Sequence, residues 1–318
     1  MKRILVTGGA GFIGSHLCER LLRDHTGELH VVDNFDDFYA RDVKEQNLAS
    51  FRDQVHFHEL DLRRGEDVAT LMDSAKPDIV VHLAAKAGVR PSIEDPDAYV
   101  RANLVAWTHL LENSVRVGTR HIAFGSSSSV YGNSAPVPFS EKDPVMEPIS
   151  PYAATKRAGE LLGYTFHHLH RVNIACLRFF TVYGPRQRPD LAIHKFARLI
   201  EAGQPITLFG DGSTSRDYTF VDDIVDGVVR TMRWLEGQDA PAFDIFNLGN
   251  SSPCTLAELV AAIESALGKS AIIERLGMQP GDVDRTFADV SHAKEVLGYE
   301  PRTELAEGLA SFVKWLRR

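Results

Sequence analysis

The sequence is poor in cysteine and contains no long apolar run. Its three cysteines, Cys18, Cys176 and Cys254, are widely spaced and form no Cys-x-x-Cys pair among the 318 residues. A disulfide framework and a zinc knuckle are therefore not expected, and a reducing, cytoplasmic location is favoured. No apolar stretch approaches the roughly 20 residues of a membrane span, so no membrane contact is expected.

An excess of positive charge is also lacking. Lys and Arg number 35 against 43 Asp and Glu, which leaves a net charge of −8. Because phosphate neutralisation needs clustered cations, nucleic acid is not an expected partner. The composition, with 44% hydrophobic and 25% charged residues, is that of an ordinary globular protein.

Short apolar runs alternate with stretches of helical period, which predicts an α/β, Rossmann-like, doubly wound parallel sheet. The expected strands are Arg3–Thr7, Leu29–Asp33, Val55–Leu60, Ile79–Ala84, His121–Gly125, Asn173–Phe179 and Phe243–Leu248. The expected helices between and after them are Gly14–Asp24, Asp67–Ser74, Tyr99–Val117 and Tyr152–Arg171.

Prolines become frequent past residue 180, and the elements there are shorter. We predict a cofactor-binding domain at 1–179, to which the chain returns near 215–248. A smaller C-terminal substrate-binding lobe is expected mainly within 180–318. In it, Thr255 and Glu258 form a capping-box pattern that predicts a helix through Leu267, and a last helix is expected from Glu304.

A glycine-rich turn follows the first predicted strand and opens the first helix. Its spacing, Gly-x-x-Gly-x-x-Gly, lets the backbone approach a pyrophosphate at a helix N-terminus. Asp33 ends the next strand, where an acid accepts hydrogen bonds from the adenosine ribose and repels a 2′-phosphate. The pattern predicts bound NAD rather than NADP; the alternative is a plain surface turn. The residues assigned to it are Gly8, Gly11, Phe12, Ile13, Gly14, Asp33 and Asn34.

Further candidates for the cofactor site lie at later strand ends. Asp61 and Leu62 are placed to flank the adenine, or they belong to a simple turn. Small residues after Leu83, namely Ala84 and Ala85, would let a cofactor approach closely. Asn103 is assigned here too, either as a brace for the segment around Tyr152 or as a local cap.

Tyr152 and Lys156 are four residues apart and share one face of a predicted helix. A nearby ammonium favours phenolate, which a tyrosine base needs because its ordinary pKa is about 10. Ser127 lies in a serine run at the end of a strand, where a catalytic hydroxyl is expected. We predict Tyr152, Lys156 and Ser127 as the catalytic residues, with the first two also contacting the cofactor.

These motifs resemble those of the extended short-chain dehydrogenase/reductase family, and within it the NAD-dependent nucleotide-sugar epimerases and dehydratases. The segments 32–39, 87–90 and 178–185 are most similar to UDP-glucuronate 4-epimerases. The resemblance implies 4-epimerisation of a UDP-sugar, from UDP-glucuronate to UDP-galacturonate, through a transient 4-keto sugar with bound NAD recycled. Tyr152 would act as base and then acid, Lys156 would tune it, and Ser127 would polarise the 4-oxygen.

The serine run separates related activities. Dehydratases carry an Asp-Glu pair where Ser128 and Ser129 stand, and UDP-glucuronate decarboxylases carry Glu at the second position. With Thr181, these serines are placed to hold the sugar carboxylate away from the geometry that loses CO₂. A UDP-glucose or UDP-N-acetylglucosamine 4-epimerase and a UDP-glucuronate decarboxylase stay alternatives. Two further alternatives are a dehydrogenase that releases NADH and a dinucleotide-binding module without catalytic activity.

The resemblance also implies ligands for the nucleotide. They are Arg188, Phe209, Arg216, Gln279 and Asp282. Phe209 would pack on the uracil, or it is a core residue. Arg216 would bind the diphosphate through its fork of donors. An arginine that many epimerases have before the Pro-Gly-Asp segment is absent here, and Arg285 is a possible replacement.

A homodimer is expected, because helices equivalent to Tyr99–Val117 and Tyr152–Arg171 form the subunit interface in this family. Trp107, at an expected surface position, favours such a partner. The alternative is that both helices simply cover the sheet. No metal is expected, since His167 and His170 have no evident carboxylate partner.

Overall fold

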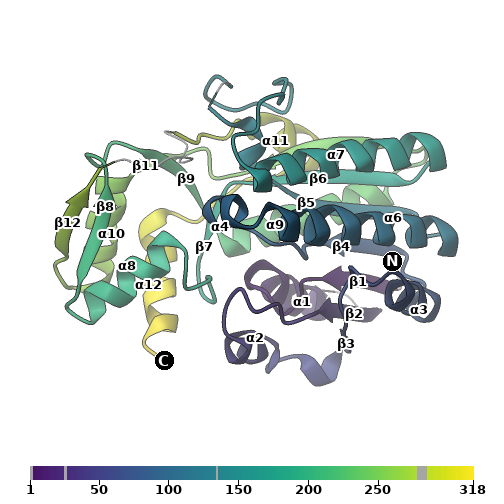
Figure 1. Ribbon diagram of the computed structural model, residues 1–318, viewed down its shortest axis with the longest axis horizontal. Coiled ribbons are helices and arrows are strands. Elements are labelled where there is room, and N and C mark those ends of the chain that lie inside the picture. The colour runs from purple at the N-terminus through teal and green to yellow at the C-terminus, as the bar shows by residue number, and fades with distance from the viewer. Residues whose placement is uncertain (1–2, 25–26, 134, 278–284) are drawn as a thin grey trace.

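Seven parallel strands form the central sheet of this protein (Figure 1). The computed structural model describes residues 3–24, 27–133, 135–277 and 285–318. The strands of this sheet are β1 (Arg3–Thr7), β2 (Glu28–Asp33), β3 (His56–Glu59), β4 (Ile79–His82), β5 (His121–Ser127), β6 (Asn173–Phe179) and β10 (Phe243–Leu248).

The strand order is β10-β6-β5-β4-β1-β2-β3, and every neighbouring pair is parallel. The chain adds β2 and β3 on one side of β1, then crosses over and adds β4 on the other. Ligands of such sheets bind where the order reverses, at the carboxyl ends of the strands. Thr7 ends β1 opposite Val32 and His82 of its two neighbours, which defines that position. The predicted doubly wound parallel fold is confirmed.

Helices cover both faces of this sheet. They are α1 (Phe12–Asp24), α2 (Arg41–Leu48), α3 (Gly65–Ala75), α4 (Val89–Glu94), α5 (Pro96–Val100), α6 (Ala106–Val117), α7 (Pro151–His170) and α9 (Val221–Glu236), with short helical turns η1 (Arg52–Gln54), η2 (Arg101–Val105) and η3 (Ser128–Tyr131). One apolar core joins α1 and α9 to the face that carries Ile4 and Val6, and another joins α3 and α6 to the face of Leu5.

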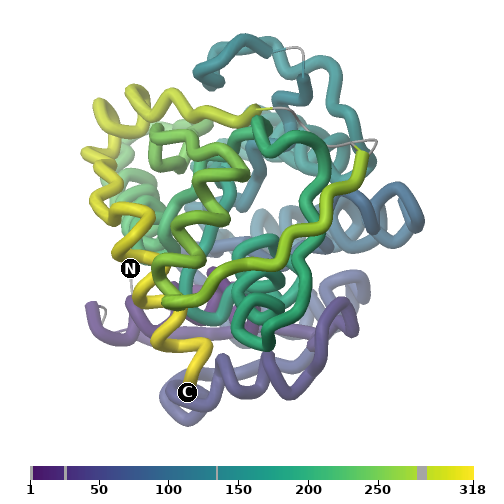
Figure 2. The backbone as a smooth tube through the Cα atoms, turned by 90° about the vertical axis from the view of Figure 1, so that its left-hand side faces the viewer, coloured from purple at the N-terminus to yellow at the C-terminus, as the bar shows by residue number. Residues whose placement is uncertain are grey.

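The smaller part of the molecule lies at the left in Figure 1. Its strands are β7 (Thr181–Tyr183), β8 (Pro205–Phe209), β9 (Ser215–Phe220), β11 (Pro253–Thr255) and β12 (Ile272–Leu276), and its helices are α8 (Ala192–Glu201), α10 (Leu256–Leu267) and α12 (Leu305–Leu316). Helix α11 (Ser291–Leu297) packs instead against β10 and α9 of the larger part. Figure 2 looks onto this part, where β12 runs beside β8 in parallel. The predicted capping box of Thr255 and Glu258 is present. The domain boundary at residue 179 stays a prediction.

All seven expected strands occur in the central sheet, but the expected helix 99–117 is interrupted. Near its start, η2 forms a π-helical turn between α5 and α6. The expected surface position of Trp107 is wrong: its side chain is fully buried and stacks on His82 and Phe124, with centroids 5.0 and 4.8 Å away. No helix in the described part of the chain combines the length and apolarity needed to cross a membrane.

Candidate active site

The glycine turn sits where the strand order reverses, between β1 and α1. The amide of Gly8 donates to the Val32 carbonyl at 2.7 Å, which ties the turn to β2. Gly8 has φ +74°, and a Cβ there would lie 2.8 Å from the Ala84 nitrogen. A Cβ on Gly14 would lie 2.1 Å from the Gly8 carbonyl oxygen. The turn is therefore packed backbone against backbone, and the N-terminus of α1 faces the space beside it.

Asp33 ends β2 next to this turn and is buried. One carboxylate oxygen accepts from the Ala10 amide at 3.0 Å, and the other accepts from the Phe35 amide at 2.9 Å. Burial raises the pKa of Asp33, and these two amides oppose the shift. The carboxylate therefore holds the glycine turn in place as well as facing the cleft.

Tyr152 and Lys156 lie in the first two turns of α7. The helix begins there because the Ser150 hydroxyl accepts from the Ala153 amide at 3.1 Å and Pro151 occupies its first position. The Lys156 ammonium donates to the Gly125 carbonyl of β5 at 2.6 Å. Burial lowers the pKa of Lys156 to about 8, against the raising effect of Glu160. The lysine is thus charged at neutral pH but close to titration.

Ser127 faces Tyr152 from the end of β5. Burial raises the pKa of the Tyr152 phenol, while a hydrogen bond with Ser127 and the charge of Arg188 lower it. Ser127 also donates to the Ser129 hydroxyl at 3.2 Å. The hydroxyls of the phenol and the serine are therefore adjacent, as proton transfer to or from one substrate oxygen requires.

A buried ion pair fixes helix α7 to the sheet. The Glu160 carboxylate of α7 accepts two hydrogen bonds from Arg178 of β6, both at 2.9 Å, and one from Ser126 of β5 at 2.6 Å. Burial raises the pKa of Glu160, but Arg178, together with hydrogen bonds from Ser126 and Arg157, lowers this pKa overall. Because Glu160 is one turn after Lys156, this pair sets the position of the lysine. The Ser126 hydroxyl is therefore engaged by Glu160, although Ser126 also borders the cleft.

One cleft, with a cavity volume of about 500 Å³, runs from the glycine turn to the serine run. Of the residues assigned from the sequence, its lining includes Gly8, Gly11, Phe12, Ile13, Gly14, Asp33, Asn34, Asp61, Leu62, Leu83, Ala84, Ala85, Ser127, Ser128, Ser129, Tyr152, Lys156, Thr181 and Arg188. The cleft therefore joins the dinucleotide motif and the predicted catalytic residues in one space.

Residues 4–249 match the model of a family described as the NAD-dependent epimerase/dehydratase family. The chain belongs to this family. A UDP-glucuronate 4-epimerase of Thermodesulfobacterium geofontis is 39% identical, over 99% of this chain and 96% of that one. The Bacillus cereus UDP-glucuronic acid 4-epimerase, solved with UDP-glucuronic acid and NAD, has TM-score 0.91 and 35% identity, covering 100% of this chain and 99% of that chain. The Thermotoga maritima UDP-glucose 4-epimerase, solved with UDP-glucose, has TM-score 0.90 and 31% identity, covering 99% and 98%.

The protein is thus an NAD-dependent nucleotide-sugar epimerase, and the predicted family and cofactor are confirmed. The residues of the cleft suit NAD. The turn at Gly8 and Gly14 leaves no space for a side chain, so the backbone itself borders the cleft. Asp33 places an acid at the end of β2, as a ribose ligand requires.

Asn103 was assigned to the cofactor site, but the structure places it behind the cleft lining. Its side chain is buried within η2, accepts from the Lys86 amide at 2.8 Å, and donates to the Lys86 carbonyl and the Thr155 hydroxyl, both at 3.0 Å. It thereby braces α7 against the loop after β4. The sequence left open whether Asn103 braces the segment around Tyr152 or caps a helix locally, and these contacts are those of a brace.

The nucleotide ligands assigned from the sequence are not all brought together. Phe209 and Arg216 do not border the cleft: the Arg90 guanidinium lies 5.1 Å from the Phe209 ring, and Arg216 donates to the Ser215 carbonyl at 2.9 Å. Gln279 and Asp282 lie outside the described residues. Arg285 borders a separate pocket with Asp211, Ser213, Thr214, Ser215, Pro253 and Thr255.

Sequence reasoning missed Lys86 and Asp36, which both border the cleft and pair at 3.0 Å. Arg188, which was assigned from the sequence, lies 5.0 Å from the Phe38 ring and pairs with Asp190 at 2.9 Å. The signal for Lys86 was present, because it directly follows Ala84 and Ala85. The Lys86–Asp36 and Glu160–Arg178 pairs each join two different elements. No sequence motif therefore predicts either pair.

Proposed function

We propose that this enzyme interconverts UDP-glucuronate and UDP-galacturonate by inverting carbon 4 of the sugar. The observation that carries the proposal is the wall of neutral hydroxyls formed by Ser127, Ser128, Ser129 and Thr181 beside Tyr152. The relative from Thermodesulfobacterium geofontis is named for the same reaction, and it covers nearly the whole chain.

Tyr152 is the group that moves the proton. Its phenolate removes the proton of the 4-hydroxyl while Ser127 hydrogen-bonds that oxygen. NAD, when bound, supplies the hydride acceptor and donor that the oxidation and the reduction at carbon 4 need. After the flat 4-keto sugar has turned over in the cleft, Tyr152 returns the proton to the oxygen. Base and acid are one group, so the enzyme recovers its starting state.

Lys156 makes this proton transfer possible near neutral pH. Burial raises the pKa of Tyr152, so an unassisted phenol would stay protonated. A positive charge beside it favours phenolate, and the Lys156 ammonium on the same helix face supplies that charge. We assign the cofactor-binding role to the glycine turn and Asp33, as well as to Tyr152 and Lys156.

The hydroxyl wall also explains why CO₂ would be retained. A 4-keto uronate is a β-keto acid, which decarboxylates when its carboxylate aligns with the carbonyl π system. Ser128, Ser129 and Thr181 donate hydrogen bonds without supplying a proton relay, because a neutral hydroxyl is a poor acid. They would hold the carboxylate out of alignment. Arg188, at the same cleft, adds a positive charge for it.

The test is to incubate the protein separately with UDP-glucuronate, UDP-glucose, UDP-N-acetylglucosamine and UDP-xylose, and to identify the products by NMR. We expect UDP-galacturonate from UDP-glucuronate, without added NAD and without NADH accumulating. A UDP-pentose with CO₂ release would make the enzyme a decarboxylase. Turnover of UDP-glucose or UDP-N-acetylglucosamine alone would assign it to the neutral sugars.

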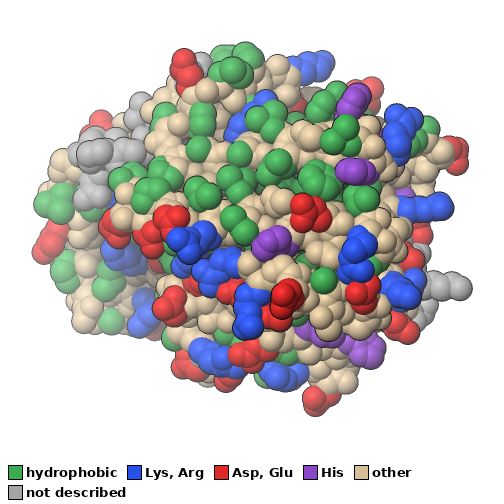
Figure 3. All heavy atoms as spheres, turned by 45° about the vertical axis from the view of Figure 1, so that its right-hand side comes forward, with side chains coloured by type: hydrophobic (Ala, Val, Ile, Leu, Met, Phe, Trp, Pro, Cys, Tyr) green, Lys and Arg blue, Asp and Glu red, His purple; other side chains and the backbone are tan. Residues whose placement is uncertain are grey.

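We also propose a homodimer in which α6 and α7 pair with the same helices of a second copy. Exposed hydrophobic side chains support it, namely Val105 before α6 and Leu161, Tyr164 and Leu169 on α7. In Figure 3, hydrophobic side chains gather in a band across the face shown. Trp107 does not contribute, because it is buried. Light scattering tests the proposal, and a monomer at micromolar concentration contradicts it.

Two further expectations belong with this function. The cofactor would be held mainly by residues 1–179 with 215–248, and the UDP-sugar mainly by the rest of 180–318. Cys18, Cys176 and Cys254 are all unpaired, which supports the predicted cytoplasmic location.

A further inference from the structure

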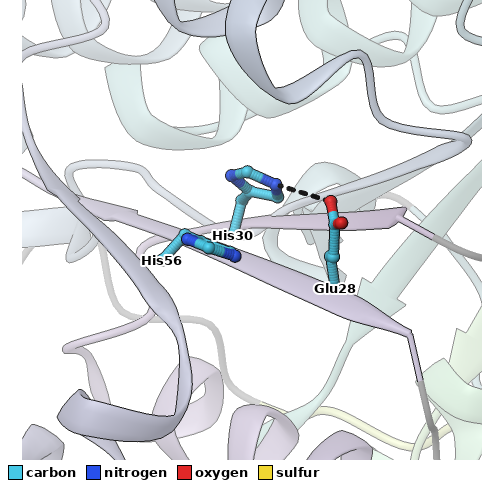
Figure 4. A group of neighbouring side chains, drawn as sticks. All are labelled: Glu28, His30 and His56. Atoms are coloured by element: carbon cyan, nitrogen blue, oxygen red, sulfur yellow. Dashed lines mark ion pairs between the residues drawn. The ribbon is translucent and has the colours of Figure 1, made fainter.

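Two histidines and a glutamate meet at the edge of the central sheet, away from the cleft. Glu28 and His30 belong to β2, and His56 belongs to the edge strand β3, where it is the register partner of His30. Successive side chains of a strand point to opposite faces of the sheet. Glu28 and His30 are five and three positions before Asp33, so their side chains lie on the face opposite to that carboxylate. Figure 4 shows the Glu28 carboxylate facing the His30 ring, with His56 beside it.

His30 is the buried member of the group and has an unused nitrogen. Its residue surface is 93% buried, since only 7% is exposed. Nδ1 lies 3.1 Å from Nε2 of His58, whereas Nε2 has no hydrogen-bond partner in the described structure. If Nδ1 donates its proton to His58, the lone pair of Nε2 points out toward Glu28. The arrangement is typical of a metal ligand whose second nitrogen is held by a neighbouring acceptor.

The distances suit one ion between these three side chains. Nε2 of His30 lies 3.8 Å from a Glu28 carboxylate oxygen, too far for a hydrogen bond. One ligand atom from each of Glu28, His30 and His56 lies within 4.8 Å of the others. Two ligands at about 2.0–2.1 Å from a tetrahedral Zn²⁺ are about 3.3 Å apart. Because Glu28 and His56 are exposed, small rotations of their side chains would bring the ligand atoms from their present separation to the one that Zn²⁺ requires.

We propose that Glu28, His30 and His56 form a binding site for a divalent transition metal ion of the Zn²⁺ class, with water as the fourth ligand. His58 acts as a positioning residue by accepting the Nδ1 proton of His30. The ligand set, two imidazoles and a carboxylate, is one that Zn²⁺ accepts and Mg²⁺ does not favour. The bound ion would join β3 to β2 and so stabilise the edge of the sheet.

A cationic side chain, Arg3, lies on the strand beside Glu28. Arg3 of β1 is the register partner of Glu28, and its guanidinium lies 3.8 Å from an Asp78 carboxylate oxygen. The site is separate from the proposed reaction, so metal binding and epimerisation are independently measurable.

The experiment is Zn²⁺ titration of the metal-free full-length protein by calorimetry, with total metal measured after dialysis. We expect one Zn²⁺ per chain and a higher Tm with Zn²⁺, but no such change with Mg²⁺. The double variant E28Q/H56N removes two exposed ligands and should bind Zn²⁺ at least tenfold more weakly. H58F, which removes the acceptor of the Nδ1 proton, should weaken binding by about 10–100-fold.

The matched control is H168N, which removes an exposed histidine on α7. It should bind Zn²⁺ as the parent does, and E28Q/H56N should keep the epimerase activity because neither residue borders the cleft. The proposal is overturned if the parent retains no Zn²⁺, or if E28Q/H56N binds it as tightly as the parent. Equal losses in E28Q/H56N and H168N would mean a general surface effect and would also overturn it.

Discussion

The two walls of the active-site cleft are built by different means. On the nucleotide wall, backbone packs on backbone: Gly8, Gly14 and the Val32 carbonyl leave no space for side chains. On the catalytic wall, buried charged side chains are held by polar contacts: Lys156 donates to the Gly125 carbonyl, and Arg178 donates to Glu160. In the proposed function, the first wall would recognise the dinucleotide by shape. The second would hold the proton-transfer group at a set position and charge.

The largest expected effect is on the catalytic wall, from Tyr152→Phe. Losing the only phenol proposed to move the proton should lower kcat by about 10³-fold, within the range for general acid–base catalysis. Binding of NAD, measured from the purified protein, should persist because the nucleotide wall is unchanged. Steady-state kinetics with UDP-glucuronate checks the first expectation. A variant with undiminished kcat would remove Tyr152 from the mechanism.

Glu160→Gln tests how the catalytic wall is held. The substitution leaves the Arg178 guanidinium buried without a counter-charge, which costs about 3–5 kcal/mol in unfolding free energy. Urea unfolding measures it. Glu59→Gln is the control, because Glu59 and Arg41 form a pair at 2.8 Å that is about half exposed and should contribute little. Similar losses in both variants would contradict the difference drawn between buried and exposed pairs.

Gly14→Ala tests the nucleotide wall. Its Cβ would lie 2.1 Å from the Gly8 carbonyl oxygen, so the turn must shift and the NAD content of the purified protein should fall at least tenfold. Gly163→Ala makes the same change in α7, where the nearest atom to the new Cβ is 3.5 Å away. That control should keep its NAD and gain a little stability, because alanine favours a helix interior. NAD retained by Gly14→Ala would disprove the steric argument.

The smallest expected effect is the pH dependence of activity and stability that Lys156, on the catalytic wall, would cause. The pKa of Lys156 falls from 10.5 to about 8 through burial, so kcat should decline as the pH rises through 8 and the ammonium loses its proton. Unfolded lysine keeps its proton up to 10.5, so the unfolded state binds more protons between these values. Stability should therefore rise from pH 8 to 10.5 while activity falls. Lys156→Met should lack this rise, as urea unfolding at several pH values would show; a parental rise in the variant would contradict the assignment.

The sequence predicted the nucleotide wall better than the charged contacts of the cleft. Glycine spacing, a strand and a terminal acid are local signals, and all of them lie at the cleft as expected. The environments of Asn103 and Trp107 were harder to predict, because their contacts come from other elements. Asn103 contacts Thr155 and Lys86. Trp107 stacks on His82 and Phe124. The Lys86–Asp36 pair joins two loops that are fifty residues apart. No spacing in the chain reveals such a contact.

Local chemistry was enough to predict the alternation of strand and helix and the glycine turn, and to make Ser127, Tyr152 and Lys156 the catalytic candidates. These features follow from apolar period, backbone freedom and the spacing of residues on one helix face, all of which act over a few positions. Tertiary structure alone decided that Asn103 supports rather than lines the cleft, that Trp107 is internal, and that Glu28 and His30 meet His56. Those outcomes depend on which strands lie next to each other. In a parallel sheet, strands that pair are joined by long crossover connections, so local sequence does not specify the pairing.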